Sequence, residues 1–378
     1  MKKLLALVLA LVMTMSLVTI SNAAFSDVDK IDHKEAVEVM NALGVINGMP
    51  DGSFAPAGNV TRAEMAKMIT IIMLGDIDAA AFKGTATDLT DINGHWAEGY
   101  IKYCYSQGVI AGRGDGTFAP NANVTAVEAA KMLLVAIGYN SDVQGYVGAD
   151  WSINVIRDAQ LSKFFDKLSV TSTKVLTRDE AAQMAFNTLK ADMVEYKGGV
   201  NVSTSDGTSV VVDSTRSKVD GSASVNYNNA TAGDRVMQFC EQYFPKLKSA
   251  VVIAGDDYSR PAVEWKYNSS SVGIYATVKP VATWTTGIED ITEGDLYKEL
   301  GFSANGTLNV YENGTANSTT DVTKGDSGKN LAAYKGATLE AYDVNDDGKA
   351  DTLIVCFPYL AQVTKVTAAT KTADRKVN

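Results

Sequence analysis

Apolar positions recur at helical spacing along much of the first half of this 378-residue chain. One such stretch spaces its apolar and aromatic side chains three or four residues apart, at Trp96, Tyr100, Ile101, Cys104 and Tyr105. A second stretch, 127–137, follows Thr125-x-x-Glu128, the signature of a capped helix start. Between them, Gly108 suits a left-handed helix end and Asp115-Gly116 predicts a turn. The pattern therefore predicts a helix–loop–helix unit.

This unit is duplicated. A shift of 64 residues aligns 25–73 with 89–137 without a gap, and 17 of the 49 positions are identical. The identities form two blocks, one reading GVIxGxxDGxFAP from Gly44 and Gly108, the other reading NVTxxExAKM from Asn59 and Asn123. A two-helix unit this small cannot bury its apolar stripe alone, so we expect the copies to pack around a shared core.

A third, weaker copy follows. Residues 151–156 resemble 96–101, and Thr177-Arg178-Asp179-Glu180 matches the second block, but the Asp-Gly-x-Phe loop is missing. In every copy a threonine is predicted to cap the second helix while a glutamate reaches back to the cap's own N–H. These structural capping residues are Thr61 and Glu64, Thr125 and Glu128, and Thr177 and Glu180.

The composition changes after Tyr196. Residues 198–231 are rich in Ser, Thr, Gly, Asn and Asp, which predicts a linker or a loosely held β-ribbon. From Ala250 onwards, short β-type runs alternate with turns. The predicted fold is multidomain, with an all-α N-terminal half of three pseudo-threefold repeats and an α+β or mostly β C-terminal domain. The predicted parts are 1–23 (signal peptide), 25–80, 86–140 and 146–197 (repeats), 198–232 (linker or ribbon) and 233–378 (surface domain, left open as a truncated one).

The start of the chain is typical of a secretory signal peptide. Lys2 and Lys3 precede a long apolar run, and Ser21-Asn22-Ala23 provides small residues for cleavage. The run is also about long enough to span a bilayer, so a membrane anchor is the alternative. No later segment is apolar enough to span, which predicts a mature chain without a membrane span.

Charge and cysteine content exclude some functions. The formal charge is −10, and it becomes −12 once the signal segment is removed. An acidic chain with no basic block argues against nucleic acid as a partner. The three cysteines, Cys104, Cys240 and Cys356, are far apart, form no CxxC pair and imply neither a disulfide framework nor a zinc site.

The repeats resemble the S-layer homology family. Its pattern begins with Phe-x-Asp-Val, as at Phe25-Ser26-Asp27-Val28, and includes His95-Trp96-Ala97 and Thr61-Arg62-Ala63-Glu64. The resemblance covers roughly residues 25–195. It implies a pseudo-threefold cluster of helix pairs whose grooves hold a secondary cell-wall polysaccharide, often one bearing a pyruvate ketal. The protein would then be secreted and held non-covalently on the peptidoglycan-associated polymer, at the cell wall or S-layer.

The resemblance also implies which residues bind. The family's groove arginine maps onto Arg62 and Arg178, whereas the second copy has Ala126 there. Trp96 is expected to be half core and half groove wall. A guanidinium beside a helix N-terminus makes a good carboxylate or phosphate site. The alternative is that both arginines merely pair with surface acids.

One further motif predicts a calcium site. Residues 343–351 place oxygen side chains at positions 1, 3, 5 and 9 of a loop with glycine at position 6. The predicted ligands are Asp343, Asn345, Asp347, Asp351 and the backbone carbonyl of Lys349. Ile354 at position 12 excludes an EF-hand. A polar hairpin turn without metal is the alternative.

Two functions remain from the sequence. The first is a non-enzymatic surface protein of the S-layer type, anchored by its N-terminal half, with self-assembly left open. The alternative is an anchored extracellular hydrolase acting on wall or external polysaccharide. Because both histidines, His33 and His95, lie in the anchor, the second half offers no histidine for a triad or a His-based zinc site. We therefore predict no enzyme and assign no catalytic residue.

Overall fold

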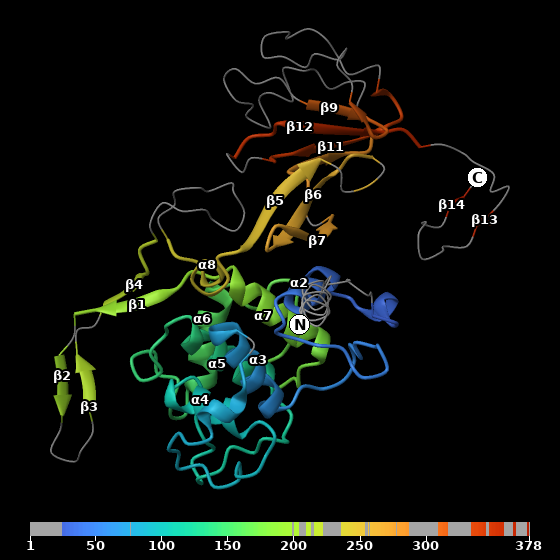
Figure 1. Ribbon diagram of the computed structural model, residues 1–378. Coiled ribbons are helices and arrows are strands. Elements are labelled where there is room, and N and C mark those ends of the chain that lie inside the picture. The colour runs from blue at the N-terminus through green and yellow to red at the C-terminus, as the bar shows by residue number, and fades with distance from the viewer. Residues whose placement is uncertain are drawn as a thin grey trace, which may run out of the picture. The chain divides into compact units, whose positions relative to one another are not determined.

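The structure is a computed structural model that describes most of residues 25–358 (Figure 1). The gaps are 76, 199, 204–208, 213–214, 222–235, 254–255, 257, 277, 287–308, 317–333 and 345–347, and beyond 358 only 366–367 and 376–377 are described. The predicted signal peptide lies outside these residues. The chain divides into two compact units, Met1–Ala250 with Glu264–Gly273, and Val251–Val263 with Ile274–Asn378. Within the described part of the chain, every helix is too short or too polar to cross a bilayer.

The first unit is built around three helix pairs (Figure 1). In each pair a polar loop separates the helices, and the second helix carries the longer apolar run. The pairs are α2 (Lys34–Ala42) and α3 (Arg62–Leu74), α4 (Glu98–Ser106) and α5 (Ala126–Ala136), and α6 (Trp151–Leu161) and α7 (Arg178–Leu189). Short 3-10 turns occupy Val28–Lys30 and Ala79–Phe82. The packing is cyclic, because α3 packs on α4, α5 on α6, and α7 on α2.

A closed ring of three backbone hydrogen bonds joins the pairs at their centre. The N–H of Val60 donates to the carbonyl of Leu176 at 3.0 Å, Val124 donates to Val60 at 2.9 Å, and Leu176 donates to Val124 at 3.1 Å. All three side chains are buried. Each residue stands immediately before a helix cap, so the ring fixes the starting points of α3, α5 and α7 together.

The three predicted capping boxes are all present, at Thr61, Thr125 and Thr177. The next N–H groups of these helices are also occupied. Arg62 donates to the carbonyl of Ala122 at 2.9 Å, and the equivalent N–H groups of α5 and α7 bind Lys174 and Gly58 at 2.8 and 2.7 Å. The helix starts are therefore satisfied by the protein itself, which stabilises the cyclic arrangement.

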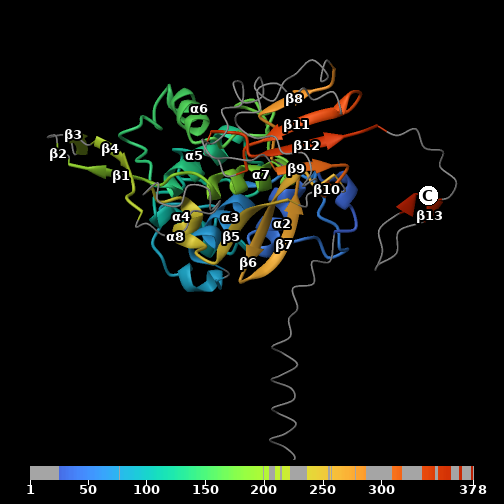
Figure 2. The ribbon, with the colours of Figure 1, turned by 90° about the horizontal axis from the view of Figure 1, so that it is seen from above.

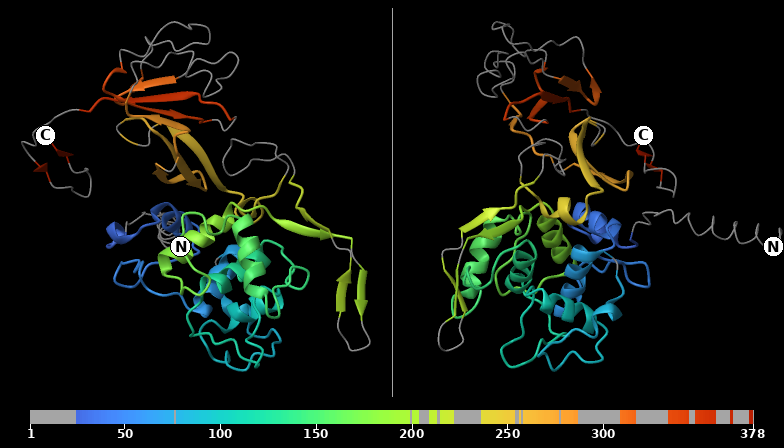
Figure 3. Two further views of the ribbon diagram at one scale, coloured as in Figure 1. Left: turned by 180° about the vertical axis from the view of Figure 1, so that it is seen from behind. Right: turned by 60° about the vertical axis from the view of Figure 1, so that its left-hand side comes forward.

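The first unit continues past the predicted end of the repeats at residue 197. Strand β1 (Val194–Lys197) pairs with β4 (Thr215–Lys218), and β2 (Val200–Ser203) pairs with β3 (Ser209–Val212) in a ribbon (Figure 3). Helix α8 (Phe239–Tyr243) buries Phe239 and Cys240 and packs on α3 and α7. The predicted boundary at 232/233 is thus not where the structure divides, because the apolar side chains of α8 complete the helical core.

Further strands follow α8. Strands β5 (Leu247–Ile253), β6 (Pro261–Tyr267) and β7 (Ser270–Tyr275) form a sheet in that order. In the first unit, the buried side chain of Trp265 meets Phe186 edge to face at 5.3 Å. Its indole N–H donates to Glu35 at 3.0 Å. The segment 264–273 is therefore part of the helical unit's core.

The second unit contains a mixed five-stranded sheet of order β10-β9-β12-β11-β8 (Figure 2). The strands are β8 (Ala282–Trp284), β9 (Asn309–Glu312), β10 (Thr315–Ala316), β11 (Thr338–Tyr342) and β12 (Thr352–Cys356). β12 runs parallel to β9 and antiparallel to β11. Its core includes Leu339, Ala341, Leu353 and Val355. Two further strands, β13 (Val366–Thr367) and β14 (Lys376–Val377), pair with each other. The predicted combination of helices and strands in a multidomain chain is confirmed.

Candidate functional site

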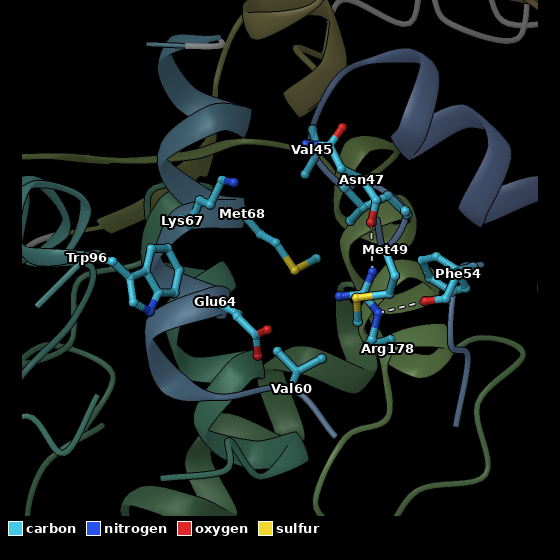
Figure 4. A pocket seen from close by; sticks show the side chains of 12 residues that line it. Val45, Asn47, Met49, Phe54, Val60, Glu64, Lys67, Met68, Trp96 and Arg178 are labelled. Atoms are coloured by element: carbon cyan, nitrogen blue, oxygen red, sulfur yellow. Dashed lines mark hydrogen bonds between the residues drawn. The ribbon is translucent and has the colours of Figure 1, made fainter. Parts of the chain in front are cut away.

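A pocket of about 220 Å³ opens where the first helix pair meets the third (Figure 4). Its wall combines the loop between α2 and α3, the first turns of α3, Trp96 from the segment just before α4, and Arg178 at the start of α7. The lining residues are Val45, Ile46, Asn47, Gly48, Met49, Phe54, Val60, Glu64, Lys67, Met68, Trp96 and Arg178. Two of the residues predicted to bind a polymer, Trp96 and Arg178, meet here. We call this site the Arg178 pocket.

Arg178 is held in place by the loop of the first repeat. Its Nε donates to the carbonyl of Phe54 at 2.9 Å and its Nη2 to the carbonyl of Asn47 at 2.8 Å (Figure 4). The guanidinium carbon lies 4.9 Å above the centre of the Phe54 ring. Burial lowers the pKa of Arg178, with Glu64 and Asp27 acting against the shift. The remaining nitrogen, Nη1, makes no hydrogen bond within the part of the chain that the structure describes.

Two other side chains contribute a cationic group and an aromatic ring to the pocket. Lys67 is half-buried on α3, and its ammonium group has neither an ion pair nor a hydrogen bond among the described residues. Trp96 lies on the opposite wall (Figure 4). It is 54% exposed although its ring packs against those of His95 and Tyr100. The pocket thus combines two cationic donors with an aromatic platform.

The loop beneath Arg178 depends on Asp27, a residue whose role the sequence argument missed. Its carboxylate accepts the N–H groups of Phe54 at 2.7 Å and Ala55 at 2.9 Å. Ala55 has a φ of 56°, so this clamp holds a residue in the left-handed region. The hydrogen bond from Phe54 is the main reason that the pKa of Asp27 is lowered. In the second copy the carboxylate of Asp91 likewise accepts the N–H groups of Phe118 and Ala119, at 2.8 and 2.7 Å. The equal spacing in the two copies was the available signal.

The equivalent position between the first and second copies, here the Arg62 interface, is closed. Arg62 donates from Nε to the carbonyl of Phe118 at 2.8 Å, from Nη1 to Glu128 at 2.9 Å, and from Nη2 to the carbonyl of Ala111 at 3.5 Å. Its side chain is 5% exposed. All three guanidinium nitrogens therefore face acceptors of the protein.

The lysine of this interface is occupied as well. Lys131, the counterpart of Lys67, donates to the carbonyl of Tyr146 at 2.7 Å. Its Nζ lies 5.5 Å above the centre of the Trp151 ring, where Trp151 corresponds to Trp96. The cationic groups that are open in the Arg178 pocket are thus used internally at the Arg62 interface.

The third interface differs again. Ala126 stands where the other copies have arginine, and Lys174 forms an ion pair with the capping residue Glu180. Gln183 occupies the place of Lys67 and is buried against Asn187. The described residues of this interface supply no open cation.

The helix starts beside the two arginines do not offer the free N–H groups that were expected to help bind an anion. The first N–H of α7, that of Arg178, donates to Gly58, and that of Asp179 donates to Pro56 at 3.2 Å. Carbonyl groups of the neighbouring loop therefore fill the anion site that the helix end would offer, so any anion must be bound by side chains.

The predicted calcium loop is described in part. Asn345 and Asp347 lie outside the described residues. Asp343 accepts the N–H of Gly348 at 2.8 Å, and Asp351 accepts the N–H of Val344 at 3.1 Å. These bonds close the turn across its ends, as a polar hairpin turn would. Among the described residues there is no group of three or more His, Cys, Asp or Glu side chains that could hold a metal ion, and the calcium site stays a prediction.

The geometry defines a class of protein: a cyclic cluster of helix pairs with an open cationic pocket between two copies. Comparison with known proteins gives the family, because the S-layer homology domain profile matches residues 24–66 and 88–130. The chain carries two S-layer homology domains and is a cell-surface protein of that type, located at the cell wall or S-layer. The predicted resemblance is confirmed.

Related proteins share this region. The chain is 30% identical over 207 residues to the "Cell surface protein" of Thermoanaerobacter kivui, covering 53% of this chain and 26% of that one. It is 34% identical over 100 residues to the "Cellulosome-anchoring protein" of Acetivibrio thermocellus (26% and 22%). It is 28% identical over 183 residues to the "Exoglucanase XynX" of the same species (45% and 16%). The chain thus spans about a quarter or less of the length of these relatives.

Proposed function

We propose that this protein is anchored non-covalently to the cell wall by an anionic secondary wall polysaccharide that binds in the Arg178 pocket. One observation carries the proposal: Arg178 Nη1 and the Lys67 ammonium have no hydrogen-bond partner among the described residues. The counterparts of both groups at the Arg62 interface are used by the protein. An open pocket with two cationic donors is suited to an anion, although the chain as a whole is acidic.

The chemistry of the wall of the pocket fits a charged sugar. A guanidinium can donate two parallel hydrogen bonds to a carboxylate or phosphate, which gives both affinity and orientation. A pyruvate ketal would supply such a carboxylate beside a sugar ring. The exposed face of Trp96 would then pack against the apolar face of the sugar, as aromatic side chains do in ligand sites.

The proposal assigns the third helix pair a binding role, although the family profile matches only the first two copies. Support comes from the ring of hydrogen bonds through Val60, Val124 and Leu176, in which the third copy is equivalent to the others.

Self-assembly and an anchored hydrolase remain predictions from the sequence. The exoglucanase relative shares only 16% of its length, and no described residue favours catalysis.

Sedimentation with cell-wall sacculi tests the proposal. The full chain should sediment with sacculi that keep their secondary polymer and stay in solution with sacculi stripped of it. Arg178→Ala should weaken this binding at least about tenfold, since a hydrogen bond to a charged group contributes about 1.5–3 kcal/mol. Arg113→Ala is the control, because Arg113 is exposed beside the Arg62 interface. Equal binding to both preparations would exclude the secondary polymer as the ligand. A loss of binding with Arg113→Ala but not with Arg178→Ala would place the binding site near Arg113 instead.

A further inference from the structure

The junction between α2 and α7 contains an ion pair that its two counterparts lack among the described residues. His33 precedes α2, and Asp179 follows Arg178 in the first turn of α7. The His33 Nδ1 lies 2.5 Å from Asp179 Oδ2, and the His33 backbone N–H donates to Oδ1 at 3.2 Å. The two side chains are 17% and 7% exposed. The residues equivalent to Asp179 in the first and second copies are Ala63 and Val127, so neither offers a carboxylate.

Both ring nitrogens of His33 face acceptors. Nδ1 faces the carboxylate of Asp179, and Nε2 lies 2.9 Å from the carbonyl oxygen of Lys167. A carbonyl and an ionised carboxylate can only accept, so both nitrogens must carry a hydrogen, which makes the ring an imidazolium. The hydrogen bond to Asp179 is the main reason that the pKa of His33 is raised. A neutral ring would leave one of the two acceptors without its hydrogen.

Several charged groups lie near this pair, and Lys190 is an electrostatic neighbour of Glu35, Lys167, Asp166 and Lys163. Asp32 precedes His33 and also raises its pKa, and Glu35 follows in the first turn of α2. Glu35 is neutralised by the ammonium of Lys167 at 3.1 Å. Lys167 has a φ of 62°, so the loop before α7 is held in the left-handed region while its carbonyl and its ammonium both bind the start of α2. The start of α2 is therefore bound to Lys167 of the third copy by two hydrogen bonds, one from His33 and one to Glu35.

The first turn of α7, which carries Arg178, is held by several of these contacts. The N–H groups of Arg178 and Asp179 bind the carbonyls of Gly58 and Pro56, at 2.7 and 3.2 Å. His33 holds the carboxylate of Asp179, while the neighbouring guanidinium turns toward Phe54 and Asn47 (Figure 4). The turn that carries Arg178 is thus fixed by the loop on one side and by His33 on the other.

We propose that His33 and Asp179 are positioning residues of the Arg178 pocket. Protonated His33 holds the first turn of α7 so that Arg178 Nη1 faces the bound anion, and loss of that proton weakens binding. This rests on the proposed function, and it adds a dependence on pH that neither a carboxylate nor Arg178 supplies near neutrality.

The experiment measures sedimentation of the full chain with polymer-bearing sacculi from pH 5.5 to pH 8.5. We expect affinity to fall about fivefold as pH rises, the low end of the coupling between linked sites. In His33→Gln, which cannot carry the charge, binding should be weaker at pH 5.5 and flat across the range. His95→Gln is the matched control. The half-buried His95 ring lies beside Trp96 and hydrogen-bonds Asn121, 3.1 Å away, so this variant can change the affinity but should keep the pH dependence. Because the chain has two histidines, the NMR titration of His33 is assignable.

The outcomes separate the two proposals. Polymer-dependent binding with the same pH profile in wild type and His33→Gln would overturn the positioning role and leave the proposed function intact. Equal binding to polymer-bearing and stripped sacculi at every pH would overturn both proposals. Circular dichroism at each pH shows whether His33→Gln is folded. If it is not, Asp179→Asn provides the second variant, with the same flat profile expected.

Discussion

The guanidinium of Arg62 forms an ion pair with the carboxylate of Glu128 at 2.9 Å, and the arginine is almost wholly buried. Arg178 occupies the same place in the Thr-Arg-x-Glu motif of the third copy, yet the structure shows no ion pair between it and the corresponding Glu64. Two arginines in equivalent motifs therefore differ in role. One closes an interface between copies, and the other faces an open pocket.

Arg62→Ala should reduce stability rather than wall binding. Removing one partner of a buried ion pair costs about 3–5 kcal/mol, and because Glu128 can regain some water we expect about 2 kcal/mol. Arg178→Ala should give a smaller loss of stability together with the loss of binding. Urea unfolding of both variants, followed by sedimentation under native conditions, makes the comparison. If folded Arg62→Ala loses binding as strongly as Arg178→Ala, Arg62 also contacts the polymer.

Gly99 should tolerate no side chain. A Cβ at Gly99 would lie 1.7 Å from the carbonyl oxygen of Ala79, which is backbone and must move. Overpacking of this kind costs about 1–3 kcal/mol, so Gly99→Ala should lower the unfolding free energy by that amount or more. Gly84→Ala is the control, since nothing lies within 4 Å of its Cβ position. Equal midpoints of urea unfolding for the two variants would show that α4 can move away from the 79–82 turn.

The stability of the first unit should depend on the charge of His33. Its pKa is raised in the folded protein, mainly by the hydrogen bond to Asp179, so the folded state binds the proton more tightly than the unfolded state. The resulting stabilisation is complete below the unfolded pKa of about 6.5 and is lost as pH rises through the folded pKa. Thermal melts should therefore show wild type losing more stability than His33→Gln between pH 6 and pH 9. Parallel curves would show that the pair does not couple proton binding to folding.

Calcium should affect the second unit alone. If the 343–351 loop binds the ion, its clustered carboxylates repel one another less when a cation sits among them. Calcium at millimolar concentration should then raise the melting temperature of the second unit's transition, as expected for a weak extracellular site. Asp347→Ala should abolish this rise, and the transition of the first unit serves as the internal control. Superimposed melts with calcium and with chelator would identify an ordinary polar turn.

The repeats, their helices and their caps could be predicted from the sequence because each depends on local chemistry. Thr125 and Glu128 are three residues apart, so their reciprocal hydrogen bonds follow from helix geometry whatever surrounds them. The family resemblance followed from the same short motifs. The extent of the first unit did not, because α8 and Trp265 join its core through contacts distant in sequence.

The sequence by itself thus determined that Arg62 and Arg178 would stand at the starts of equivalent helices. Only the tertiary structure decided which of them is open. The Nη1 of Arg62 donates to Glu128, 66 residues away, and the ion pair of Asp179, the residue after Arg178, joins residues 146 apart. Such pairings depend on how the three copies close into a ring, and the closure of a ring is a property of the whole cluster that no single repeat encodes.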